Sequence, residues 1–242
     1  MQTHIGCSGF YYGGWKGIFY PKELPKNKWL PYYANHFDTV EINNSFYKIP
    51  KEATFQKWYD ATPPDFKFAL KGNRYMTHIK KLKIDEQFRE RLFLFQNLAL
   101  GLKEKLGCIL WQFPGSIVKN LIKLEKFCSS LNKDIPHVIE FRHISWFEEP
   151  VFETLSAHRI GFCMISAPDN LPETVKVTSQ IAYVRFHGKY AWYNYNYSHE
   201  ELEEWKYKLA NLKADQLYIY FNNDYSGYAI QNSKALKKIL ET

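Results

Sequence analysis

The chain has 242 residues and a mass of 28.8 kDa, which suits one large α/β domain and exceeds a minimal module. With 45% hydrophobic and 24% charged residues, the composition is globular and excludes a mainly disordered chain. Lysine and arginine outnumber aspartate and glutamate by 32 to 25, and this net charge of +7 favours anionic partners, although a solvated basic surface is the plainer explanation. We expect residues 1–242 to form a single domain.

The four cysteines, Cys7, Cys108, Cys128 and Cys163, form no C-x-x-C pair, and three of them lie in apolar runs. This pattern is typical of buried thiols in a reducing compartment rather than of disulfides or a zinc site. The N-terminus has no basic segment followed by an apolar one, and no apolar run approaches the roughly 18 residues of a membrane span. The sequence therefore predicts a cytoplasmic protein without a membrane partner.

Short, nearly continuous apolar runs recur along the chain and are typical of parallel strands covered by helices. The eight predicted strands are Thr3–Cys7, Thr39–Ile42, Phe66–Leu70, Cys108–Gln112, Val138–Phe141, Gly161–Ile165, Ala182–Phe186 and Leu217–Phe221. Eight such units predict an α/β fold, a single (β/α)8 TIM-like barrel, rather than an open doubly wound sheet.

Amphipathic stretches lie between most of these strands. Apolar spacing predicts helices over 85–100, 118–131 and 227–240, and capping boxes at Ser145–Glu148 and Ser198–Glu201 predict two further helix starts. Residues 167–180 contain two prolines and no clear helical spacing, so we expect an irregular or missing helix after the sixth strand.

Polar side chains follow seven of the eight predicted strands, at the end where TIM barrels carry their active sites. Residues two apart on an extended segment share a face, so Glu41, Asn43 and Ser45 are expected to point into one pocket with the groups of other strands. The candidate catalytic residues are Glu41, Glu140, His187 and Asp224. The candidate substrate-binding residues are Tyr11, Asn43, Ser45, Tyr47, Lys71, Gln112, Arg142, Trp146, Arg185, Asn222 and Asn223.

The charges in this set suggest roles. Lys71, Arg142 and Arg185 indicate an anionic ligand group, because cationic side chains match phosphate and carboxylate. A glutamate or His187 would then serve as general acid or base. The alternative is that Glu41 and Glu140 only neutralise the cations in a structural ion-pair network. The aromatic candidates are either core residues or stacking platforms.

A divalent metal is a further alternative with weak support. His187, Glu41, Glu140 and Asp224 carry suitable ligand atoms, and His78 is one more candidate. The sequence contains no H-x-x-x-H or clustered histidine pattern.

The strand ends taken together resemble the YecE-like family, domain of unknown function 72. The matching segments are Gly6–Tyr11 with Trp15 and Tyr20-Pro21, Glu41–Tyr47, Phe66–Lys71, Thr77-His78, Leu110–Pro114, Glu140–Trp146, Tyr183–Gly188, and Tyr220–Asp224 with Ala229 and Asn232. They run from the first predicted strand to the last helix. The resemblance implies a TIM-like barrel and no settled activity.

Three functions remain open at this point. The leading one is an enzyme-like pocket for an anionic, phosphate-bearing ligand with a hydrolytic or lyase step, the ligand being a small molecule or a nucleic acid that stacks on the 190–197 tyrosine-rich stretch. The second is a carbohydrate-active enzyme that uses Glu41 and Glu140 as its carboxylate pair, with Trp146 against the sugar. The third is a binding protein without catalysis.

Overall fold

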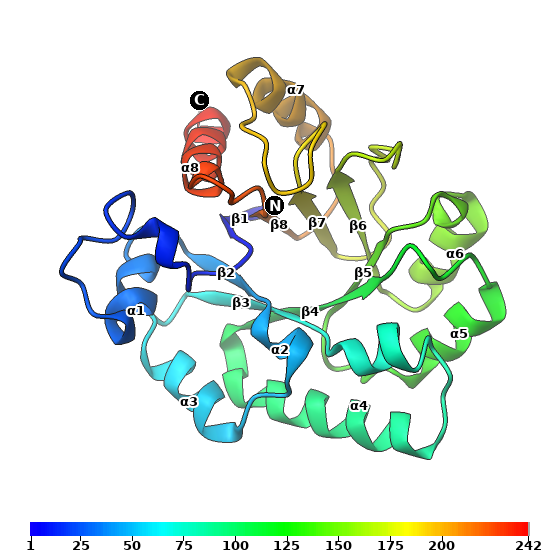
Figure 1. The fold of residues 1–242 in the computed structure, drawn as a ribbon. Coiled ribbons are helices and arrows are strands. Elements are labelled where there is room, and N and C mark those ends of the chain that lie inside the picture. The colour runs from blue at the N-terminus through cyan, green and yellow to red at the C-terminus, as the bar shows by residue number, and fades with distance from the viewer. Residues whose placement is uncertain (242) are drawn as a thin grey trace.

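A computed structural model describes residues 1–241 and contains eight parallel strands in the order β1-β8-β7-β6-β5-β4-β3-β2 (Figure 1). A bridge between Ser8 and Glu41 joins the two outer strands at one end, so the sheet is nearly closed. The strands are β1 (Gln2–Cys7), β2 (Thr39–Ile42), β3 (Lys67–Lys71), β4 (Leu106–Phe113), β5 (His137–Phe141), β6 (Gly161–Ser166), β7 (Ile181–Phe186) and β8 (Gln216–Phe221). The TIM-like barrel expected from the sequence is confirmed.

The helices lie outside the strands (Figure 1). They are α1 (Trp29–Ala34), α2 (Asn44–Tyr47), α3 (Glu52–Asp60), α4 (Glu86–Ala99), α5 (Leu121–Ser130), α6 (Glu149–Ala157), α7 (His199–Ala210) and α8 (Tyr228–Glu241). The described chain has no helix between β6 and β7, which confirms the irregular connection expected there. No helix within residues 1–241 combines the length and hydropathy that a bilayer crossing requires.

The two predicted capping boxes have opposite outcomes. Ser198 caps α7, because its hydroxyl accepts from the Glu201 amide while the Glu201 carboxylate accepts from the Ser198 amide. The box at Ser145 is wrong. Ser145 lies in a short 3-10 turn, its hydroxyl accepts from the Lys119 amide, and the helix begins only at Glu149.

Side chains divide the core into two parts because successive strand residues point to opposite faces. An outer part packs the strands against the helices, and an inner part fills the barrel. The inner part consists of Ala69, Cys108, Leu110, Val138, Cys163, Ile165, Ala167, Ile181, Tyr183, Tyr218 and Tyr220. Because these side chains fill the barrel, no channel runs through it in the described chain, and polar groups lie at its C-terminal mouth. All four cysteines are buried free thiols, as expected.

Candidate functional site

Four strands place a charged side chain inside the C-terminal mouth of the barrel: Glu41 on β2, Lys71 on β3, Glu140 on β5 and Arg185 on β7. Each lies two positions after a fully buried residue that faces the barrel interior, so strand alternation aims all four into one space. We call Ser8, Glu41, Glu140, Arg142, Tyr183, Arg185 and His187 the mouth cluster.

Arg185 lies at the centre of the mouth cluster and is fully buried. Its Nη2 donates to Oε1 of Glu41 at 2.7 Å and to the Ser8 hydroxyl at 3.0 Å. Its Nη1 donates to Oε2 of Glu140. One guanidinium therefore bridges two carboxylates from strands on different sides of the barrel, and its planar fork suits this geometry.

The Glu41 carboxylate has its remaining oxygen positions filled as well. Tyr183 donates its hydroxyl to Oε2 at 2.6 Å, and the Ser8 hydroxyl donates to Oε1. Asn43 then donates to the Ser8 oxygen at 2.8 Å. Glu41 thus has a hydrogen-bond donor on each of its carboxylate oxygens.

Glu140 is held as an anion. Arg142 donates from Nε to its Oε1, and Arg185 donates to its Oε2. Burial opposes ionisation of this carboxyl, but the two guanidinium groups outweigh burial and hold its pKa well below the usual range. The Arg142 guanidinium also stacks on Trp192, with Cζ 4.3 Å from the ring centroid.

His187 is neutral. Burial, together with the neighbouring Arg142 and Arg185, lowers the pKa of its imidazole well below the usual value. Nη2 of Arg142 lies 3.0 Å from Nε2 of His187, and the side-chain nitrogen of Asn222 lies 3.1 Å from its Nδ1, so a nitrogen donor faces each side of the ring. Gly188, with a φ of 108°, makes the turn after His187, and a Cβ there would lie 2.1 Å from the Ala191 carbonyl oxygen.

Lys71 differs from the other cations of the mouth. Its Nζ lies 4.5 Å from the centroid of the Phe46 ring and has no hydrogen bond or ion pair within residues 1–241. Burial, and after it the positive charge of Arg185, lowers the pKa of Lys71 to about 8. Gly72 follows directly, and a Cβ there would lie 2.1 Å from the Trp111 indole, so this strand end passes closely along that ring.

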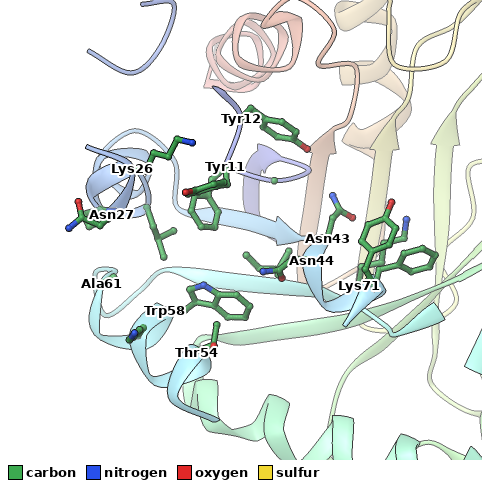
Figure 2. Close-up of a pocket in the computed structure, with 18 of the residues that line it drawn as sticks. Tyr11, Tyr12, Lys26, Asn27, Asn43, Asn44, Thr54, Trp58, Ala61 and Lys71 are labelled. Atoms are coloured by element: carbon green, nitrogen blue, oxygen red, sulfur yellow. The ribbon is translucent and has the colours of Figure 1, made fainter. Parts of the chain in front are cut away.

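A groove of about 850 Å³ opens beside Lys71 and runs outward over β2 to α1 and α3 (Figure 2). We call it the mouth groove. It is lined by Gly9, Phe10, Tyr11, Tyr12, Lys26, Asn27, Leu30, Pro31, Ile42, Asn43, Asn44, Phe46, Tyr47, Thr54, Lys57, Trp58, Ala61, Lys71, Tyr193 and Asn222. Three of these residues are lysines, and none of the described lining residues is acidic. Figure 2 shows Lys26 and Lys71 on opposite sides of the groove, with Tyr11 and Asn44 between them.

Eight of the candidate residues meet at the mouth. They are Glu41, Asn43, Lys71, Glu140, Arg142, Arg185, His187 and Asn222. Tyr11 and Tyr47 line the mouth groove further out. Gln112 pairs in register with Glu140 and lies on the inward face of β4, but it does not line the groove.

Ser45 and Trp146 are corrections to the sequence-based set. Residues 44–47 form the short helix α2, so Ser45 leaves the extended face of Glu41 and donates its hydroxyl to the Lys71 carbonyl at 2.7 Å. Trp146 is fully buried, stacks on Phe141 and donates its indole N–H to the Ile117 carbonyl at 2.7 Å. Neither side chain is open to a ligand.

Asn223 and Asp224 also lie outside the mouth cluster. Asn223 is buried and donates to the Asn232 side chain at 2.7 Å. Asp224 accepts from the Trp15 indole at 2.6 Å, and burial raises its pKa to about 6. The chain turns out of the barrel after Asn222, so these two side chains follow the turn rather than the strand face.

The sequence reasoning missed Ser8 and Tyr183 in the mouth cluster, and Lys57 and Trp58 in the groove. Strand alternation could have identified Tyr183, since it lies two positions before Arg185. Lys57 and Trp58 lie on α3, a helix that the sequence reasoning did not predict. Within residues 1–241 no group of three or more His, Cys, Asp or Glu side chains is arranged to hold a metal ion.

Several known proteins are similar to this chain in sequence. The sequence model for "Protein of unknown function DUF72" matches residues 4–242. UPF0759 protein YunF of Bacillus subtilis (strain 168) is 30% identical over 271 residues, covering 99% of this chain and 95% of YunF. UPF0759 protein YecE of Escherichia coli (strain K12) is 30% identical over 120 residues, 49% of this chain and 43% of YecE.

The crystal structure of a DUF72 family protein from Thermotoga maritima MSB8 is similar to the whole chain. It has a TM-score of 0.89, 32% sequence identity and complete coverage of both chains. The chain therefore belongs to the DUF72 family.

Proposed function

We propose that this DUF72 protein binds an anionic small molecule in the mouth groove and acts on it there. The observation that supports the proposal is the charge of the lining: Lys26, Lys57 and Lys71 without a described acidic lining residue. A cavity of about 850 Å³ is of the size that small-molecule sites have. Cations that lack a protein counter-ion attract an anion more strongly than cations already paired.

The inner end of the groove is the better-defined anchor for the anionic group. Lys71 is shielded from water on one side by Phe46 and has no ion pair in the described chain. Asn43 and Asn222 line the groove where it meets the mouth cluster, since they bind Ser8 and His187. A phosphate or carboxylate at this end would meet one cation and two amides.

The middle of the groove suits a planar or apolar ligand body. Tyr11 packs against Trp29 with ring centroids 5.1 Å apart, and the Trp58 ring also lines the groove. Lys26 lies 5.8 Å from the Tyr11 ring centroid at the outer end. We therefore expect a ligand that combines an anionic group with an aromatic or apolar part.

The mouth cluster supports the groove rather than supplying a free base. Glu41 and Glu140 are both bonded to Arg185, which occupies the space between them. A two-carboxylate glycosidase needs the scissile bond in that space, so the arrangement argues against this alternative. The groups left to act on a ligand are those that face the groove, with Lys71 foremost.

The packing of side chains in the tyrosine-rich segment, residues 190–197, favours a small molecule over a nucleic acid as the ligand. Tyr197 is buried, and Tyr195 packs against both Tyr190 and Tyr197. Trp192 covers Arg142. Tyr190 and Tyr193 remain exposed, and two rings make a smaller stacking platform than the full run of aromatic residues in the segment would.

Isothermal titration with phenyl phosphate, inorganic phosphate and phenol tests the proposal. Phenyl phosphate should bind more tightly than either fragment, and Lys71→Met should weaken its binding at least tenfold. Lys133→Met is the matched control, because Lys133 is exposed just before β5, at the opposite end of the barrel. Equal binding by wild type and Lys71→Met would overturn the proposal.

A further inference from the structure

We infer that Lys71 is an amine nucleophile that forms an imine with a carbonyl group of the ligand. This inference rests on the proposed function, because it places the carbonyl compound in the mouth groove. It goes further by assigning a covalent step to one residue and by naming the substrate class, an anionic aldehyde or ketone.

The position of Lys71 is that of a reactive group rather than a structural one. It is the last residue of β3, its Nζ rests on the Phe46 ring, and its side chain lines the groove. Its Nζ has no bonded partner within residues 1–241. A structural lysine in a buried place normally has its three donors satisfied. Lys105 is an example, since it donates to the carbonyls of Tyr59 and Thr62 at 2.6 and 2.7 Å and to the Thr62 hydroxyl at 3.2 Å.

The mouth cluster explains why Lys71 remains unpaired. Glu41 and Glu140 lie close enough to influence it, but their oxygens are bonded to Arg185 and, in Glu140, to Arg142 as well. Arg185 and Arg142 thus occupy the carboxylate oxygens that could otherwise pair with Lys71. They also place positive charge near its amine. Lysine next to another cation in a desolvated site is a recognised way of making a nucleophilic amine.

The protonation state of Lys71 agrees with this geometry. Burial and the charges of Arg185 and Arg142 favour the free amine, Glu140 and Glu41 oppose this, and the resulting pKa of Lys71 is about 8. At pH 7 about a tenth of the side chain is then uncharged, against less than a thousandth for an ordinary lysine.

His78 adds no further charge at this place. Its ring meets the Phe46 ring edge-on with centroids 4.9 Å apart, so it flanks the same aromatic ring as Lys71. Burial, and after it the charge of Lys71, lowers the pKa of His78 to about 4. His78 is therefore neutral at pH 7.

The covalent step needs no co-reactant. The Nζ lone pair attacks the carbonyl carbon, a proton passes from nitrogen to the former carbonyl oxygen, and a carbinolamine results. The hydroxyl group then takes one proton from solvent, the C–O bond breaks, the oxygen leaves as water, and a protonated imine remains on Lys71. This cation withdraws electrons from the adjacent carbon, which is the use enzymes make of lysine imines.

Reductive trapping tests the inference. The protein is incubated with pyridoxal 5′-phosphate, which carries an aldehyde, a phosphate and an aromatic ring, and is then treated with borohydride. Peptide mapping should find the pyridoxyl group on Lys71 at least tenfold above its level on Lys26, Lys57 or Lys133. In the wild type, the labelling rate at Lys71 should rise with a midpoint near pH 8.

Two analogues separate this inference from the proposed function. Pyridoxine 5′-phosphate has no carbonyl, so it should bind the groove and protect Lys71 without forming an adduct. Binding of that analogue without selective labelling of Lys71 would overturn the imine and leave the proposed function standing. Selective labelling by phosphate-free pyridoxal at an undiminished rate would support the imine and count against anion recognition. Labels spread over the surface lysines in proportion to exposure would overturn the inference.

Discussion

The Arg185 guanidinium donates to Glu41 at 2.7 Å in a place where neither side chain is exposed to solvent. The same guanidinium reaches Glu140 through its other terminal nitrogen. Three groups from three strands are therefore tied together inside the mouth. A buried pair of this kind contributes little net stability while intact but is costly to break, because the remaining charge has no partner.

Replacing Arg185 with methionine should lower the free energy of unfolding by about 3–5 kcal/mol, because two buried carboxylates lose their shared cation. Urea unfolding followed by circular dichroism measures this. The exposed control Lys133→Met should change stability by no more than about 0.5 kcal/mol. A loss in Arg185→Met as small as in the control would mean that the carboxylates are not paired as described.

Glu140→Gln should make the free energy of unfolding less dependent on pH in the acidic range. The pKa of Glu140 is held well below its usual value, so its contribution is fully present above about pH 4.5 and is lost as the pH falls further. The variant should be less stable than wild type at pH 7, and the gap should narrow between pH 5 and pH 3. A gap that does not change with pH would contradict the ion pairing.

Lys71→Met should separate function from stability. The pKa of Lys71 is lowered to about 8, so the folded state disfavours its charge, and this penalty disappears as the pH rises from about 8 to 10.5. At pH 7 the variant should therefore have a free energy of unfolding equal to or higher than that of wild type. It should also lose phenyl phosphate binding. If Lys71→Met were markedly destabilised, Lys71 would have a structural role instead.

Asp224→Asn should leave ligand binding and pyridoxal labelling unchanged, because Asp224 bonds to Trp15 outside the mouth cluster. Burial raises the pKa of Asp224 to about 6, so its ionised form destabilises the fold increasingly as the pH rises from 3.8 through 6. The variant should thus be at least as stable as wild type at pH 7 in thermal unfolding. Loss of labelling would return Asp224 to the candidate catalytic residues.

Lys26→Met and Lys57→Met should each weaken phenyl phosphate binding by about two- to fivefold, since exposed charges contribute about 0.5–1 kcal/mol. The affinity of wild type for phenyl phosphate should fall as the salt concentration rises, because salt screens the charges of exposed lysines. Binding that is independent of salt and of both substitutions would exclude the outer end of the groove from anion recognition.

Much of the fold could be predicted because parallel strands are buried on both faces and read as apolar runs. The same alternation placed Glu140 and Arg185 in one space, since each continues an inward strand face. It failed for Ser45, where a helical turn interrupts the extended segment, and for Asp224, which follows the turn after β8. Trp146 follows a strand like the true mouth residues, but its indole packs into the outer core.

The mouth groove itself could not be predicted. Its outer wall comes from α1 and α3, short helices whose positions depend on packing against the barrel rather than on a local motif. The sequence also could not show that Lys71 remains unpaired. This depends on which cationic side chains bond to Glu41 and Glu140 in the folded structure.

A crystal structure with phenyl phosphate tests the central claim most directly. We expect density for the phosphate within hydrogen-bond distance of the Lys71 Nζ, with the ring lying along Tyr11 in the mouth groove and the mouth cluster unchanged. An empty groove at saturating phenyl phosphate, or phosphate bound only at surface lysines away from the mouth, would contradict the account.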